Sequence, residues 1–147
     1  DLLNQMLDEA LAHQHPELGI LVENIQADGL RHFEDSPSGR LWCPGHALEV
    51  SWFLMKILDQ YPDQKKFSQV LLNTEQALEL GWDEKFDGLL YFMDTQFRPM
   101  MELEWDMKLW WPHTEAIVAL AHAWRRTEDQ KWLEWLARIG LLLENIC

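Results

Sequence analysis

One helix start, rich in aromatic and polar residues, constrains the fold of this chain more than any other stretch. Two consecutive tryptophans precede Pro112, and an apolar run at 116–120 follows it. Proline suits the first position of a helix, because its missing N–H would have no partner there. The stretch therefore predicts a helix that begins at Pro112, with the two tryptophans directly before its N-terminus and with His113 and Glu115 in its first turn.

Such a stretch is typical of two different environments. Aromatic rings around a pair of polar side chains are typical of a sugar-binding site, but they also occur at the hydrated edge of a helical core. The chain contains nine tryptophans, each of which buries a large apolar area and offers one N–H. A tryptophan-rich core and a carbohydrate-facing groove explain this composition equally well, so the rest of the chain must decide.

Apolar residues recur at helical spacing in four further segments, which predicts a mainly α-helical chain. In the loop before the helix at Pro112, the apolar stretch 89–93 is expected to form a β-hairpin with residues 100–103. The further helices are predicted at 1–13, from Pro44 to the stop at Tyr61-Pro62, at 63–80, and after a cap at 127–129.

Polar motifs precede alternate helices in this scheme. Cys43-Pro44-Gly45-His46 comes before one helix, and Trp111-Pro112-His113 comes before another. Alternate helices of antiparallel pairs start at the same end, so both motifs are expected at one end of an α/α barrel or bundle. The predicted fold class is therefore all-α, with short β-hairpins in the loops.

Charge and composition argue against several classes of function. The net charge of −13 disfavours binding to nucleic acid or to an anionic membrane surface. No apolar run reaches the roughly 20 residues of a membrane span. The two cysteines, Cys43 and Cys147, form no CxxC motif, which argues against a disulfide framework and for a reducing cytoplasm.

His46 is the first candidate for acid–base chemistry. It lies three residues before Glu49, so the two side chains share one face of a helix. Histidine titrates near neutrality, and we expect the helix N-terminus to lower the pKa of His46 and to favour its neutral, basic form. The alternative is a buried histidine that hydrogen-bonds Glu49 for structural reasons.

Three further polar residues surround the tryptophan motif. His113 and Glu115 are two apart and point in different directions on a helix, so at most one is expected to reach the cavity of His46. Lys108 either belongs to a solvated acidic approach, or binds a substrate hydroxyl or pairs with Glu115.

Metal and phosphate sites are not predicted. The chain has no HExxH motif, no His/Cys/Asp set at ligand spacing and no glycine-rich phosphate loop. The remaining histidines lack partners at useful spacing and are expected to be structural or on the surface; they are His13, His15, His32 and His122.

Several motifs resemble those of one enzyme family. They are similar, in order, to segments of the N-acylglucosamine 2-epimerases, also called renin-binding proteins. The chain departs from the family at Cys43, where asparagine is usual. The similar segments are HPELG at 15–19, Glu23-Asn24, GRLWCPGHALEVSWFL at 39–54, GWD at 81–83, GLLYFMD at 88–94 and LEWDMKLWWPHTEA at 103–116.

The resemblance implies an (α/α)6 barrel of helical hairpins that is longer than this chain. Both ends of the sequence also look like cuts through helices, because apolar residues at helical spacing are present from Leu2 and continue to Ile146. We therefore expect residues 1–147 to be a single fragment from the middle of the barrel, without its N- and C-terminal parts.

The resemblance also implies an isomerase that interconverts N-acetylglucosamine and N-acetylmannosamine by ring opening, removal of the C2 proton and reprotonation on the other face. His46 matches a catalytic histidine and Glu115 a catalytic-site carboxylate. Glu49 would orient His46 or the sugar, and Trp111 would stack on the sugar. Lys108 and His113 are further substrate-binding candidates. The family's second catalytic histidine belongs to a C-terminal motif that the chain lacks.

Alternative functions remain open at this point. An aldose–ketose isomerase or a cellobiose-type epimerase fits the same barrel, and a non-catalytic, renin-binding fragment fits the family's second name. The resemblance implies a sugar substrate, a homodimer of the longer parent protein, and a nucleotide as an allosteric effector in some members. No bound cofactor is expected, and the cysteine content places the protein in the cytoplasm. Renin is the only protein partner that the resemblance suggests.

Overall fold

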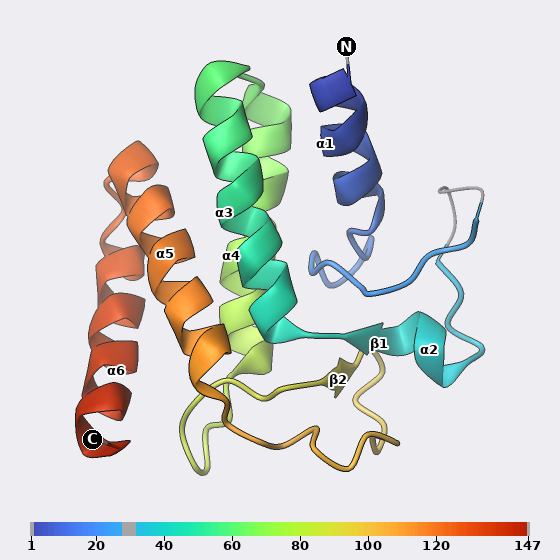
Figure 1. The fold of residues 1–147 in the computed structure, drawn as a ribbon, viewed down its shortest axis with the longest axis vertical. Coiled ribbons are helices and arrows are strands. Elements are labelled where there is room, and N and C mark those ends of the chain that lie inside the picture. Colours follow the sequence, from blue (N-terminus) through green and yellow to red (C-terminus); the bar gives the residue numbers. More distant parts are fainter. Residues whose placement is uncertain (1, 28–31, 147) are drawn as a thin grey trace.

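Two antiparallel helix pairs form the body of the molecule. The computed structural model describes residues 2–27 and 32–146. Helix α3 packs against α4 and α5, and α5 packs against α6, while α1 stands beside the first pair (Figure 1). The elements are α1 (Leu2–Ala12), α2 (Pro37–Arg40), β1 (Leu41–Trp42), α3 (Pro44–Gln60), α4 (Gln64–Gly81), β2 (Met93–Asp94), α5 (Trp110–Thr127) and α6 (Gln130–Ile146).

Local signals place the helix boundaries close to the predicted ones. Asp63 caps α4, because its carboxylate accepts a hydrogen bond from the Lys66 N–H at 3.0 Å. Pro44 opens α3 as predicted. Helix α5 begins two residues earlier than expected, at Trp110, so Pro112 occupies its third position. Proline is tolerated there because the first N–H groups of a helix have no intrahelical partner.

The predicted hairpin between residues 89–93 and 100–103 is wrong. Strand β2 pairs antiparallel with β1, with Leu41 opposite Asp94 and Trp42 opposite Met93. The buried ion pair between Arg40 Nε and Asp94 Oδ2, at 2.8 Å, joins the same two segments. A buried charge needs such a partner, so this tertiary contact decides the pairing. The loops do contain isolated antiparallel bridges, Gln14–Leu21 and Trp82–Leu89.

The core lies between the helices and is closed by large apolar side chains. Helix α5 presents three fully buried alanines at spacings of three and four, which allows the neighbouring helices to approach closely; they are Ala116, Ala119 and Ala123. Leu48, Leu58, Leu78, Trp132 and Ile139 are likewise buried. None of the described helices is long and apolar enough to cross a membrane.

The strands and long loops gather at the end of the molecule where α3 and α5 begin (Figure 1). The two motifs singled out in the sequence therefore lie at the same end, as predicted. Cys43, directly before α3, is buried and free. Cys147 lies outside the described residues.

Candidate active site

The first turns of α3 and α5 meet around Gly45. The ring of Trp111, on α5, lies 5.2 Å from the ring of His46, on α3, measured between centroids. A Cβ atom on Gly45 would come within 2.6 Å of two ring atoms of Trp111. Only glycine allows this approach without displacing the indole, so Gly45 brings the tryptophan against the histidine.

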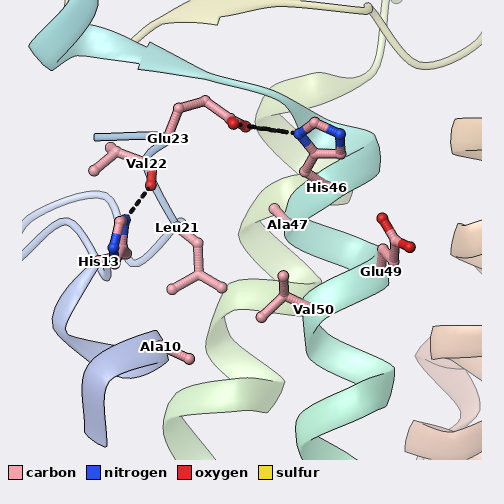
Figure 2. Close-up of a pocket in the computed structure, with 9 residues that line it drawn as sticks. All are labelled: Ala10, His13, Leu21, Val22, Glu23, His46, Ala47, Glu49 and Val50. Atoms are coloured by element: carbon pink, nitrogen blue, oxygen red, sulfur yellow. Dashed lines mark hydrogen bonds and ion pairs between the residues drawn. The ribbon is translucent and has the colours of Figure 1, made fainter. Parts of the chain in front are cut away.

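Glu23 is the polar partner of His46. Its Oε1 and Oε2 atoms lie 3.1 and 3.3 Å from His46 Nδ1, and Figure 2 shows the carboxylate pointing at that nitrogen. The backbone N–H of Glu23 donates to the Leu41 carbonyl at 2.9 Å, which fixes the segment after α1 beside β1. The His46 side chain remains 49% exposed and that of Glu23 26%, so the pair faces solvent.

The pKa of His46 is raised above its ordinary value, chiefly by the hydrogen bond to Glu23. The prediction that the helix N-terminus would lower this pKa is therefore wrong. A carboxylate in contact stabilises the imidazolium more than the partial charge of the helix N-terminus destabilises it. Because a carboxylate only accepts, Nδ1 carries the donated hydrogen. The other ring nitrogen lies on the side away from Glu23 (Figure 2).

Glu49 lies one turn further along α3 and does not bind His46. Figure 2 shows its carboxylate below His46, pointing away from Glu23. Among the described residues no hydrogen-bond partner of Glu49 is found, and its side chain is half-buried. The alternative of a structural His46–Glu49 pair is thus replaced by the His46–Glu23 pair.

Glu115 is held by the neighbouring helix. Its Oε2 accepts a hydrogen bond from Trp52 Nε1, on α3, at 2.6 Å. Lys108 pairs with a different carboxylate, so of the alternatives left open for it the pairing with Glu115 is wrong. Its ammonium donates to Asp83 Oδ2 at 2.8 Å and lowers the pKa of that carboxyl. Lys108 lies in the loop before α5, next to the turn that contains Asp83, and that position decides its partner.

His113 occupies a position unlike that of His46. It is 2% exposed, its Nδ1 donates to the Leu109 carbonyl at 2.7 Å, and its Nε2 accepts from the Leu89 N–H at 2.9 Å. Burial lowers its pKa. Both ring nitrogens are therefore occupied by backbone groups, and His113 holds the 82–89 turn against α5 instead of facing a sugar, in contrast to the predicted role.

A cavity of about 340 Å³ lies beside His46, between α3 and the end of α1 (Figure 2). This is within the usual size range of small-molecule sites. Its walls are mostly apolar and its polar side chains include the Glu23–His46 pair and Glu49. The lining residues are Ala10, His13, Leu21, Val22, Glu23, His46, Ala47, Glu49 and Val50.

Two features of the site were missed by reasoning from local spacing. Glu23 lies 23 residues before His46, and only the resemblance of Glu23-Asn24 to a family motif pointed to it. Glu23, Cys43 and His46 also form a group whose ligand atoms lie within 4.8 Å of one another. Burial raises the pKa of the Cys43 thiol to about 12.

Known proteins are similar to nearly the whole chain. The family pattern described as N-acylglucosamine 2-epimerase (GlcNAc 2-epimerase) matches residues 3–146. The N-acylglucosamine 2-epimerase of Rattus norvegicus is 36% identical over 136 residues, which cover 88% of this chain and 31% of the rat protein. That of Bos taurus is 39% identical over 79% of this chain and 28% of its own length. The chain thus spans about a third of these relatives.

Solved structures give the architecture. A cellobiose 2-epimerase from Bacillus thermoamylovorans B4167 superposes with a TM-score of 0.75 at 19% identity, over 97% of this chain and 34% of that one. A sugar epimerase from a ruminal bacterium gives 0.74 at 17% identity, over 98% and 35%. These structures are (α/α)6 barrels, and the helix pairs described here correspond to part of such a barrel, as predicted. By sequence and by fold, the chain belongs to the N-acylglucosamine 2-epimerase family.

Proposed function

We propose that the protein interconverts N-acetylglucosamine and N-acetylmannosamine, with His46 as one of its two acid–base groups. The observation that carries the proposal is the Glu23–His46 pair, in which one ring nitrogen is anchored, the other has no partner among the described residues, and the ring lies against that of Trp111. The relatives that are 31–39% identical to the chain are all N-acylglucosamine 2-epimerases, and their name supplies the substrate.

His46 acts on the open-chain form of the sugar. With its Nδ1 hydrogen donated to Glu23, the ring offers the Nε2 lone pair, which removes the proton from C2 and leaves an enediolate-type intermediate. A base whose pKa lies near the working pH is effective in this step. The hydrogen bond to Glu23 then stabilises the imidazolium that forms, just as it raises the pKa of His46 in the free protein.

The remaining polar and aromatic groups position the sugar. Trp111 offers an indole face for stacking on the sugar ring or chain. The hydrogen bond from Trp52 fixes the Glu115 carboxylate, whose second oxygen accepts a substrate hydroxyl or stabilises charge at the reacting carbons. Glu49, which has no partner among the described residues, accepts another hydroxyl. Lys108 and His113 have no part in this scheme, because their polar atoms are already engaged.

Inversion at C2 needs a second acid that returns the proton to the opposite face of the intermediate. Family resemblance places this group in a C-terminal histidine motif that is not among the 147 residues. His113 does not replace it, because neither of its ring nitrogens is free. We therefore assign the complete reaction to the full-length protein, in which both acid–base groups are present.

The test is proton exchange at C2. The full-length protein is incubated in heavy water with N-acetylmannosamine, and in parallel samples with mannose and with cellobiose. We expect loss of the C2 proton signal and appearance of N-acetylglucosamine in the first sample only. Turnover of cellobiose or mannose alone would instead favour the alternative reactions on this barrel.

Matched variants assign the roles in the same assay. His46→Gln and Glu115→Gln are expected to slow exchange at least about 100-fold, whereas Glu134→Gln, at an exposed carboxylate on α6, is expected to exchange normally. Exchange at the normal rate in His46→Gln would contradict the proposal.

A further inference from the structure

Glu23, Cys43 and His46 bring three different donor atoms to one point. The residues come from the extended segment after α1, from the residue between β1 and α3, and from the first turn of α3. Their ligand atoms all lie within 4.8 Å of one another. We infer that these three side chains form a binding site for a zinc-type divalent cation, and that the ion inhibits the enzyme.

The donor set suits such an ion. Zinc takes thiolate, imidazole and carboxylate ligands at about 2.0–2.3 Å, so the donors of a tetrahedral site lie roughly 3.5 Å apart. His46 Nδ1 and Glu23 Oε1 are already 3.1 Å apart. Both of these side chains are partly exposed and can adjust toward the Cys43 sulfur, while water fills the fourth position. Magnesium and calcium, which prefer oxygen ligands, are disfavoured by the sulfur.

The surroundings of Cys43 favour a cation. Cys43 is the N-cap residue of α3, and its side chain makes no capping hydrogen bond. The nearby backbone N–H groups of His46 and Gly45 nevertheless favour the thiolate. Burial opposes ionisation of this thiol most strongly, and the negative charges of Glu23 and Glu49 add to that opposition. A divalent ion replaces the thiol proton and neutralises this repulsion. Binding therefore releases a proton, and the affinity rises with pH.

The inhibitory part of the inference rests on the proposed role of His46. An ion bound to Nδ1 displaces the hydrogen that this atom donates to Glu23, and the neutral ring must then carry its hydrogen on Nε2. The Nε2 lone pair that would remove the C2 proton is lost, and Glu23 is no longer free to stabilise the imidazolium. Metal binding itself does not depend on the catalytic proposal.

Cobalt(II) provides the test, because a thiolate bound to it gives an intense charge-transfer absorption. The protein is titrated with Co²⁺, in a background in which Cys147 is replaced by Ser, and Zn²⁺ is then added as a competitor. We expect a band that saturates at one ion per chain and that zinc removes. Cys43→Ser should abolish the band, and Glu23→Gln should weaken binding at least about tenfold.

His13→Gln is the matched control. His13 lines the same cavity, but its ring is bonded to the Val22 carbonyl at 2.9 Å and is outside the donor group. Its replacement should leave cobalt affinity unchanged. Should Cys43→Ser fail to fold, Cys43→Asn introduces the residue usual in the family. On the unchanged protein, zinc must shift the His46 ring resonances.

Absence of a charge-transfer band, or a band of equal strength in the Cys43 variants, would overturn the site. Zinc inhibition of C2 exchange is measured separately on the same protein. Saturable cobalt binding at Cys43 without inhibition would overturn only the inhibitory role. A protein without epimerase activity that still shows the band would contradict the proposed function and leave the metal site standing.

Discussion

His46 and His113 lie in similar local sequences but in opposite environments. Each histidine follows a proline near the start of a helix, and the two helices begin at the same end of the molecule. His46 is exposed, bonded to a carboxylate, and has a raised pKa. His113 is buried, bonded to two backbone groups, and has a lowered pKa.

The comparison teaches that a helix N-terminus alone does not set the protonation of a histidine. The helix field acts in the same direction on both rings, so the opposite shifts must come from the neighbours. A carboxylate in contact favours the charged ring, whereas burial without one favours the neutral ring. The first arrangement keeps a titratable group available to a ligand, and the second fixes one tautomer as part of the core.

Of the changes considered, replacement of His46 should have the largest effect, and that effect should be on activity and not on stability. His46→Gln is expected to lower kcat for N-acetylmannosamine epimerisation by about 10²–10⁴-fold, since an acid–base group contributes this much. The exposed position predicts little change in stability. Kinetics and thermal melting of the same sample provide the check, and a large fall in Tm would contradict the contrast with His113.

Replacing His113 should affect stability instead. His113→Leu leaves the Leu89 N–H and the Leu109 carbonyl without their partner in a buried region. Each buried unsatisfied group costs about 1–3 kcal/mol, so for the two groups we expect a loss of about 2–6 kcal/mol in the free energy of unfolding. Urea denaturation monitored by circular dichroism measures it. Normal stability with lost epimerisation would instead place His113 in the chemistry.

Helix positions were predictable from the sequence because their causes are local. The Pro44 start of α3 and the Asp63 cap of α4 act within one turn. The predicted hairpin at 89–103 failed because β2 pairs with a segment about 50 residues away, beside the buried Arg40–Asp94 ion pair. Apolar alternation identifies a strand but does not identify its partner.

In the candidate site, too, locally encoded features were predictable and contacts between distant segments were not. Residue type and motif made His46 a candidate acid–base group, whereas its partner Glu23 comes from a distant segment. Glu115 was likewise a candidate, but its contact with Trp52 spans two helices. The partners that set pKa and orientation depend on tertiary packing, so spacing along the chain suggested Glu49 as the partner of His46 and Lys108 as a partner of Glu115 instead.

A third prediction tests the contact that brings Trp111 against His46. Gly45→Ala places a Cβ within 2.6 Å of the Trp111 ring, and overpacking of this kind costs about 1–3 kcal/mol. Gly140→Ala is the matched control, because nothing lies within 4 Å of a Cβ there, and alanine in a helix should add about 0.5–1 kcal/mol. Equal effects of the two changes, measured by urea denaturation, would contradict the close approach.

The smallest expected effect distinguishes the two histidines by pH. Glu23→Gln removes the carboxylate that raises the pKa of His46. A base must be unprotonated to act, so activity falls as pH drops through this pKa. The acidic limb of kcat/KM should therefore move to lower pH in the variant, and the pKa of His113, which has no contact with Glu23, should stay unchanged in an NMR titration.

The Glu23–His46 pair should also affect stability, but with a pH dependence opposite to that of activity. Because folding raises the pKa of His46, the protonated pair stabilises the protein most below the unfolded value, while Glu23 stays ionised, and this stabilisation is lost as pH rises through the folded pKa. The side chains are partly exposed, so the difference between wild type and Glu23→Gln should stay below about 1 kcal/mol. A difference that grows toward alkaline pH would show that Glu23 acts on another group, and the contrast between the two histidines would lose its electrostatic explanation.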